Sequence, residues 1–283
     1  MVKIISDSTC DLSPELLERY DIDLLPLHII LGEQDYEDGS GITPDEIYCW
    51  SEASRQTPKT AAVSVEQAER CFRTYLEEGS EIVCFAISAS MSSSANAMRL
   101  AAQKLEAEDR IHVIDSANLS TGVGLMVIEA SRLAQHGLSG KEIAACMEEI
   151  KPHVRASFIV DTLTYLHRGG RCSGAAALVG STLKLHPKIV VEGGKMSPAK
   201  KYRGRMSRVI GEYVEDLMPE LQTAVKDRVF ITHSGCDEAD IEMVRGKLEA
   251  LNHFEEILIT RAGGVISSHC GPGTLGVLFI SGN

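Results

Sequence analysis

The sequence has 283 residues, of which 44% are apolar and 24% are charged, and its formal net charge is −12. This length suffices for two domains of ordinary size, each with a buried core. The excess of negative charge repels phosphate backbones, which excludes nucleic acid from the expected partners.

Eight cysteines are scattered along the chain, and no CxxC pair occurs. Most of them lie in apolar runs, which indicates reduced core residues. The first residues lack the apolar segment of a signal peptide, and no apolar run is long enough to span a bilayer. We therefore expect a cytoplasmic protein that makes at most transient contact with a membrane surface.

In the first half of the chain, short apolar runs alternate with helical patterns. Strands are predicted over residues 2–5, 24–31, 82–87 and 111–114, with a turn at residues 32–35. Three helices are predicted to begin after the N-cap residues Ser13, Thr43 and Ser64, and the last of these covers residues 65–78. Strands that alternate with helices predict βαβ units and a mostly parallel sheet flanked by helices.

The second half has the pattern of an α+β domain with a mixed sheet. Strands are predicted over residues 154–160, 188–192, 195–202, 229–232, 256–260 and 275–280, and the second and third of these form a hairpin. A short helix at residues 161–166, which ends at Gly169-Gly170, precedes a helix rich in alanine. We therefore predict two domains, residues 1–155 and 156–283, with a ligand between them.

Polar side chains follow several predicted strands, at residues 6–9, 88–94 and 115–118. In parallel sheets ligands bind beyond the carboxyl ends of the strands, where helix N-termini offer N–H groups to an anion. N-capping alone would also explain several of these residues. Near the end of the chain, residues 263–273 combine close glycines, two serines, His269 and a Gly-Pro-Gly turn. Together these segments predict a pocket for a small polar head group.

Several motifs of common enzymes are missing from the sequence. It contains no GxxxxGK[ST], HExxH or GxSxG segment and no His/Cys cluster with metal-ligand spacing. Residues 271–276 fit GxGxxG formally, but the segment leads into a β-rich run and not into the helix of a βαβ unit. We therefore expect no metal and no nucleotide cofactor.

One stretch of the acidic chain is strongly basic. Residues 193–211 contain no Asp or Glu but carry six cations, Lys195, Lys200, Lys201, Arg203, Arg205 and Arg208. Such a stretch is either a solvated face or a docking surface for an acidic partner or an anionic ligand.

Five segments in chain order resemble the DegV family of bacterial fatty-acid-binding proteins. They are Ile4-Ile5-Ser6-Asp7-Ser8, residues 87–94, Tyr165-Leu166-His167-Arg168-Gly169-Gly170-Arg171, Lys201-Tyr202-Arg203-Gly204-Arg205 and Ser268-His269-Cys270-Gly271-Pro272-Gly273. The resemblance implies two α/β domains with a long-chain fatty acid bound between them. It also implies a non-catalytic subunit that presents this lipid to a separate ATP-dependent fatty-acid kinase, which converts the carboxylate to an acyl phosphate.

The resemblance also assigns roles to individual residues. Thr60, Ser92 and His269 are expected to bind the fatty-acid carboxylate. Ser93, Arg171 and Gly271 are expected to support the pocket. The basic residues Lys201, Arg203 and Arg205 are expected to dock the kinase.

The chain departs from the family pattern at two places in this head-group pocket. The family usually has Thr-Ser-Gln-Pro-Ser where this chain has Thr60-Ala61-Ala62-Val63-Ser64, and Leu-Ser-Gly-Thr where it has Met91-Ser92-Ser93-Ser94. Both departures change side chains next to the expected carboxylate ligands.

Two other functions fit parts of the sequence. Ser92 and His269 could belong to a hydrolase whose catalytic residues meet only in space. The chain could also be a subunit similar to dihydroxyacetone kinase that holds a small carbonyl compound on a histidine. The long acyl tail of the ligand distinguishes the fatty-acid-binding function from the binding of a small carbonyl compound. A long tail should supply most of the affinity, because burying each methylene contributes about 0.8 kcal/mol.

Overall fold

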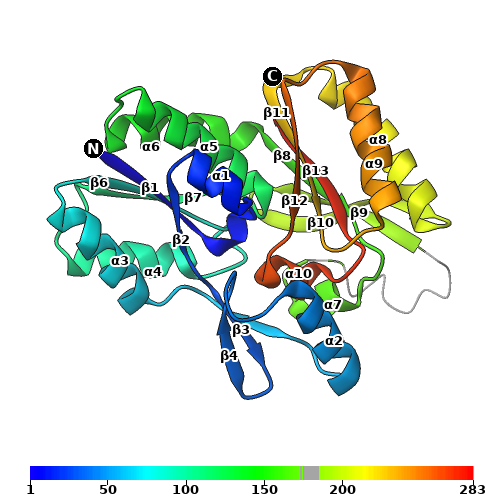
Figure 1. Ribbon diagram of the computed structural model, residues 1–283, viewed down its shortest axis with the longest axis horizontal. Coiled ribbons are helices and arrows are strands. Elements are labelled where there is room, and N and C mark those ends of the chain that lie inside the picture. Colours follow the sequence, from blue (N-terminus) through cyan, green and yellow to red (C-terminus); the bar gives the residue numbers. More distant parts are fainter. Residues whose placement is uncertain (173, 175–184, 283) are drawn as a thin grey trace.

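The computed structural model describes residues 1–172, 174 and 185–282. Figure 1 shows a parallel sheet and its helices beside a larger mixed sheet, with a small third sheet below and between them. This arrangement confirms the predicted α/β fold with a mostly parallel N-terminal sheet and a mixed C-terminal one. The division of the chain into domains at residue 155 stays a prediction.

The N-terminal sheet has four parallel strands. In spatial order they are β2 (Ile22–Leu25), β1 (Val2–Asp7), β6 (Glu81–Ala86) and β7 (Ile111–Asp115). Helices α5 (Thr121–Gln135) and α6 (Gly140–Ile150) cover one face, and α3 (Val65–Glu77) and α4 (Ser94–Lys104) cover the other (Figure 1). Because both faces are covered, successive strand residues such as Ile4 and Ile5 are buried in different core clusters.

The predicted N-caps are confirmed. The hydroxyl of Ser13 accepts from the first turn of α1 (Pro14–Arg19), and Thr43 does the same for α2 (Pro44–Ser54). Ser64 caps α3 in the same way, and both Thr43 and Ser64 form capping boxes with the residue three positions on. These helix starts are therefore set by local sequence.

The C-terminal sheet has six strands of mixed direction. Their spatial order is β10 (Lys195–Arg203), β9 (Leu185–Glu192), β8 (Val154–Ile159), β13 (Leu275–Ser281), β11 (Ala224–His233) and β12 (Glu256–Arg261). The predicted hairpin is confirmed, because β9 and β10 pair antiparallel around Gly193 and Gly194. Helices α8 (Met206–Leu221) and α9 (Glu238–Leu251) cover one face, while α5 contacts β8 and β13 on the other. Because α5 contacts β8 and β13 as well as the N-terminal sheet, the two large sheets pack around a shared core.

The small sheet consists of β4 (Gln34–Glu37), β3 (His28–Leu31) and β5 (Lys59–Ala61), all antiparallel. The prediction of one continuous strand over residues 24–31 is wrong. The segment is divided into β2 and β3 at Pro26, which has no N–H to donate to a ladder. The turn predicted at residues 32–35 is shorter than expected, because β4 begins at Gln34.

Two short helices lie beside this sheet, α7 (Thr164–Gly169) and α10 (Gly264–Cys270) (Figure 1). Helix α7 begins three residues later than predicted. Helix α10 replaces the glycine-rich turn expected around His269, and it contacts α7, α2, β3 and β5. The alanine-rich helix expected after Gly170 falls mainly on residues 175–184, which lie outside the described residues.

Candidate functional site

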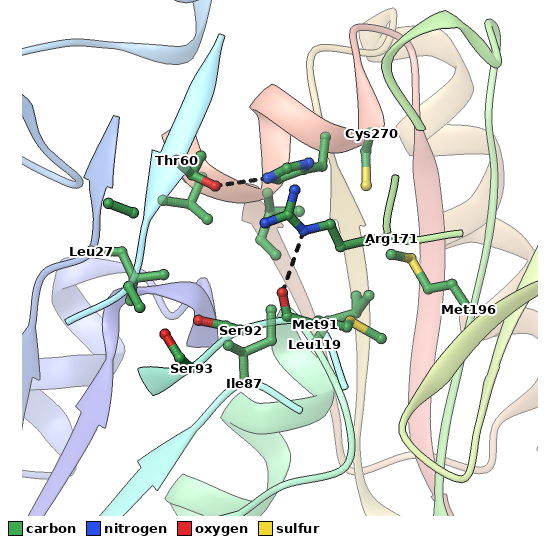
Figure 2. Close-up of a pocket in the computed structure, with 15 residues that line it drawn as sticks. Leu27, Thr60, Ile87, Met91, Ser92, Ser93, Leu119, Arg171, Met196 and Cys270 are labelled. Atoms are coloured by element: carbon green, nitrogen blue, oxygen red, sulfur yellow. Dashed lines mark hydrogen bonds between the residues drawn. The ribbon is translucent and has the colours of Figure 1, made fainter. Parts of the chain in front are cut away.

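A cavity of about 190 Å³ lies where the three sheets meet. Its walls come from segments far apart in the chain, including β5, the loop that follows β6, α10 and the start of β10 (Figure 2). The lining residues are Leu27, Thr60, Ala61, Ala62, Ile87, Met91, Ser92, Ser93, Leu119, Arg171, Met196, Val265, Ile266, His269 and Cys270. Most of this lining is apolar, and its few polar side chains can fix the orientation of a ligand.

Thr60 and His269 meet in this cavity although 209 positions separate them. The Thr60 hydroxyl lies 2.8 Å from Nε2 of His269, a hydrogen bond drawn as a dashed line in Figure 2. Nδ1 of His269 is buried and has no hydrogen-bond partner among the described residues. A Cβ on Gly169 of α7 would lie 2.4 Å from this Nδ1, so glycine is needed there for the imidazole to fit.

The imidazole of His269 is held in its neutral form. Burial, and to a lesser extent the nearby Arg171 guanidinium, lower its pKa to about 4. A neutral imidazole has one donor and one acceptor nitrogen. It can therefore hydrogen-bond a carboxyl group or a hydroxyl, and the Thr60 contact restricts its orientation.

Residues 88–94, here called the serine loop, connect β6 to α4. The Ser92 and Ser94 hydroxyls lie 3.0 Å apart, and the backbone N–H of Ser94 donates to Ser92 Oγ. Ser93 is the N-cap residue of α4, but its side chain makes no capping hydrogen bond and is exposed. Ser92 and Ser93 thus offer hydroxyls to the cavity at the positively polarised end of a helix of 11 residues.

Arg171 lies at the rim of the cavity. Its Nε donates to the Met91 carbonyl at 3.4 Å, and one terminal nitrogen donates to the Gly169 carbonyl at 2.6 Å. Figure 2 shows its side chain reaching from the α7 side toward the serine loop. The guanidinium therefore links two walls and places a positive charge beside His269.

A second, smaller cavity of about 30 Å³ adjoins the first. The two share the residues Leu119, Ile266 and Cys270. The second cavity extends toward Phe158 and Leu278 of the C-terminal sheet, and its exposed lining is almost wholly apolar. The polar end of the site is thus followed by apolar space.

Two buried aspartic side chains, Asp11 and Asp38, hold the helix that carries His269. Asp38 accepts hydrogen bonds from the backbone N–H groups of Gly264 and Val265, and Asp11 accepts one from Gly263. Burial raises the pKa of both carboxyl groups, that of Asp11 to about 8. Sequence reasoning missed this pair, because the partners are more than 220 positions apart and share no local motif.

The residues predicted for the site separate into three groups. Thr60, Ser92, Ser93, Arg171 and His269 all line the cavity. Gly271 follows the lining residues of α10, and a Cβ there would lie 2.6 Å from the Tyr165 ring. The remaining three, Lys201, Arg203 and Arg205, lie outside the cavity. Their expected roles stay predictions.

The basic stretch is only partly neutralised. Lys200 pairs with Asp216 of α8, and Arg208 pairs with Glu212 within that helix. Lys201, Arg203 and Arg205 are all exposed, and none of the three forms an ion pair within the described part of the chain. We call these three residues the docking surface, after the role expected of them from the sequence.

The geometry does not favour the hydrolase alternative. Within the described residues, Ser92 makes no hydrogen bond with His269, whose Nε2 is engaged by Thr60. In the described ranges, no carboxylate contacts Nδ1 to orient the imidazole as a general base. The serine and the histidine therefore lack the arrangement that activates a nucleophile.

Comparisons with known proteins agree over the whole chain. The model of the DegV family, described as uncharacterised proteins, matches residues 1–282. The chain belongs to the DegV family. A DegV domain-containing protein of Deinococcus radiodurans is 31% identical over 276 residues, which cover 98% of this chain and 97% of the relative.

Solved structures of the DegV family share the fold. A Thermus thermophilus DegV protein described by its fatty-acid binding is 32% identical, with a TM-score of 0.91 and 99% of each chain covered. A stearic acid-binding protein from Eubacterium ventriosum is 29% identical, with a TM-score of 0.85, 100% of this chain covered and 99% of that one. Among the described residues of our DegV chain, no helix combines the length and the apolarity needed to cross a membrane.

Proposed function

We propose that this protein binds a long-chain fatty acid and presents its carboxylate to a separate ATP-dependent fatty-acid kinase for acyl-phosphate formation. Thr60, Ser92 and His269, here called the head-group cluster, would bind the carboxylate, with Ser93, Arg171 and Gly271 supporting the pocket. The protein would act in the cytoplasm as a non-catalytic subunit, with no cofactor besides the lipid. Contact with a membrane surface would be transient at most.

One observation carries this proposal: a neutral histidine and a few other polar side chains line a cavity whose remaining lining is apolar, and a second cavity adjoins it. Family membership supports it, because two related structures are described as binding fatty acids, one of them stearic acid. A dihydroxyacetone-like ligand would use only the polar end and leave the apolar lining unfilled. A lipid tail uses both parts.

The tail and the carboxylate are expected to contribute unequally to the binding free energy. A tail of about 15 methylenes gives roughly 12 kcal/mol of gross burial energy, before the cost of ordering the chain. A hydrogen bond to a charged group contributes only about 1.5–3 kcal/mol. The tail would therefore supply most of the affinity, and the head-group cluster would fix where the carboxylate lies.

The docking surface gives the proposed kinase a place to bind. Lys201, Arg203 and Arg205 are positive groups on a chain of charge −12, and no acid lies among residues 193–211. A kinase face that is acidic would meet them with complementary charge. The lipid and the kinase would thus use different residues of β10 and its surroundings.

Lipid analysis of the purified protein tests the fatty-acid proposal. The protein should leave a bacterial host with a bound fatty acid, seen by native mass spectrometry and in the organic extract, and should take up added palmitate. A protein that carries no lipid and takes up neither palmitate nor oleate would contradict the proposal. Uptake of dihydroxyacetone alone would favour the small-carbonyl alternative, and hydrolysis of an ester substrate would favour the hydrolase.

A further inference from the structure

Ser88 and Gly194 join the serine loop to the tip of the β9–β10 hairpin. The Ser88 hydroxyl donates a 2.7 Å hydrogen bond to the Gly194 carbonyl, across 106 positions of sequence. Both residues are buried, and the Ser88 side chain is 1% exposed. Since neither residue lines the cavity, the lipid site alone gives no reason for this contact.

Ser88 also organises the loop that carries Ser92. Its carbonyl accepts from the N–H groups of Met91 and Ser92, and its hydroxyl accepts from the N–H of Ser90. Its own N–H donates to the Asn118 carbonyl at 2.8 Å. The position of Ser92 therefore depends on where Ser88 is held.

The hairpin tip fits closely against the loops of the N-terminal sheet. A Cβ on Gly194 would lie 2.6 Å from Ser88 Oγ and 3.5 Å from Ala117 Cα. The neighbouring Gly193 is exposed, and a Cβ there would meet nothing within 4 Å. Both glycines have positive φ, 54° and 78° respectively, so alanine would strain the backbone at either position, but it would clash only at Gly194.

From this tip, β10 runs past the lipid site to the docking surface. Met196, next along the strand, lines the cavity, and Lys201 and Arg203 stand toward its other end. At about 3.3 Å per residue, the strand from Lys195 to Arg203 spans roughly 26 Å. One strand thus touches the serine loop, the cavity wall and the docking surface.

We propose that Ser88 and Gly194 are positioning residues that hold the serine loop in a fixed relation to the docking surface, so that the docked kinase finds the carboxylate at a constant place. This inference rests on the proposed function. It differs from lipid binding and from docking, because it concerns the relative placement of the two. A misplacement of about 1 Å can cost as much as 100-fold in rate.

Kinase assays on three palmitate-loaded variants test the positioning role. Ser88→Ala removes the hydrogen bond, Gly194→Ala pushes the tip away, and Gly193→Ala is the matched control. We expect the first two to lower kcat about tenfold while KM for the loaded protein stays within about twofold. Gly193→Ala should match the wild type. Unchanged kcat in both test variants, or a raised KM alone, would overturn the proposal.

A second measurement needs no kinase. Palmitate enriched with ¹³C at its carboxyl carbon should give one narrow carboxyl resonance in the wild type and in Gly193→Ala, and a shifted or broadened one in the two test variants. If Gly194→Ala does not fold, Ser88→Ala decides, because it removes only one hydroxyl. A wild type without bound palmitate would overturn the proposed function itself, whereas bound palmitate with identical resonances in all variants would overturn only the positioning role.

Discussion

The head-group cluster and the docking surface differ in burial and in how their polar groups are paired. His269 is buried, neutral and hydrogen-bonded to Thr60, on a helix held by two aspartic side chains from distant segments. Lys201 and Arg203 are exposed and charged, on the outermost strand of the C-terminal sheet. We therefore expect changes in the first region to act through geometry, and changes in the second through long-range charge and salt.

Removing two members of the head-group cluster should give the largest effect. In Ser92→Ala combined with His269→Ala, the carboxylate loses two hydrogen-bonding groups, while the apolar lining remains. We expect phosphorylation of bound palmitate to fall about 100-fold or more, and palmitate affinity to fall much less, because the tail dominates binding. Single-turnover kinase assays and palmitate titrations measure the two quantities. Equal losses in both would show that the cluster only binds lipid.

Gly169→Ala should disturb the same cluster by displacing the His269 side chain. The added Cβ would lie 2.4 Å from His269 Nδ1, so the imidazole must move and its bond to Thr60 must weaken. We expect phosphoryl transfer to fall on the order of tenfold, through geometry alone. Gly170→Ala is the control: its Cβ meets nothing within 4 Å, although its φ of 68° strains an alanine by about 1–2 kcal/mol. Gly170→Ala should lose stability but keep the wild-type rate of phosphoryl transfer. A slower transfer in Gly170→Ala, with a normal rate in Gly169→Ala, would contradict our account of Gly169.

Arg203→Gln should test the docking surface with a smaller effect. We expect palmitate affinity to stay at the wild-type value and KM for the kinase reaction to rise severalfold, in line with about 1 kcal/mol for an exposed charge pair. Added salt should weaken the wild type more than the variant. Arg245→Gln on α9, where Arg245 pairs with Glu242 and Glu249, is the matched control and should leave KM unchanged. Loss of palmitate with intact kinase binding would assign Arg203 to the pocket instead.

The smallest effect concerns stability and pH. Because the pKa of Asp11 is raised by burial to about 8, the folded protein keeps this proton at pH values where the unfolded chain, with a pKa near 4, has lost it. The stability contributed by this proton is therefore lost as pH rises between about 4 and 8. Asp11→Asn cannot titrate, so its melting temperature should gain on the wild type by about 3–5 °C between pH 6 and 7, because one pH unit changes the stability of the wild type by about 1.4 kcal/mol. Asp109→Asn, at an exposed acid, should show no such gain.

Local signals predicted much of the fold. The hydroxyls of Thr43 and Ser64 bond within the first turn of the helices that they begin, so a few residues decide each start. The same holds for the hairpin around Gly193-Gly194, whose positive φ values favour glycine. Such features need no information from distant parts of the chain.

Helix α10 could not be predicted in this way. Its residues include two β-branched side chains, two serines and a histidine, none of which favours a helix strongly. Its N-cap is Gly263, which has no side chain to cap with, and Asp11 and Asp38 supply the hydrogen bonds from the other end of the sequence. Strand β5, with three residues, is likewise set by its pairing with β3. The residue pattern around His269 indicated a polar pocket without predicting the helix, whereas Thr60 came only from the family resemblance.

The bond between Thr60 and His269 has a consequence for the order of events during synthesis. A growing chain makes Thr60 early and must add 209 further positions before its partner exists. Until then the polar end of the cavity is incomplete, and its apolar walls lack α10 as well. If the protein binds a fatty acid as proposed, loading would follow translation of residue 269, and a nascent chain paused upstream of it would have no complete cavity to bind the lipid.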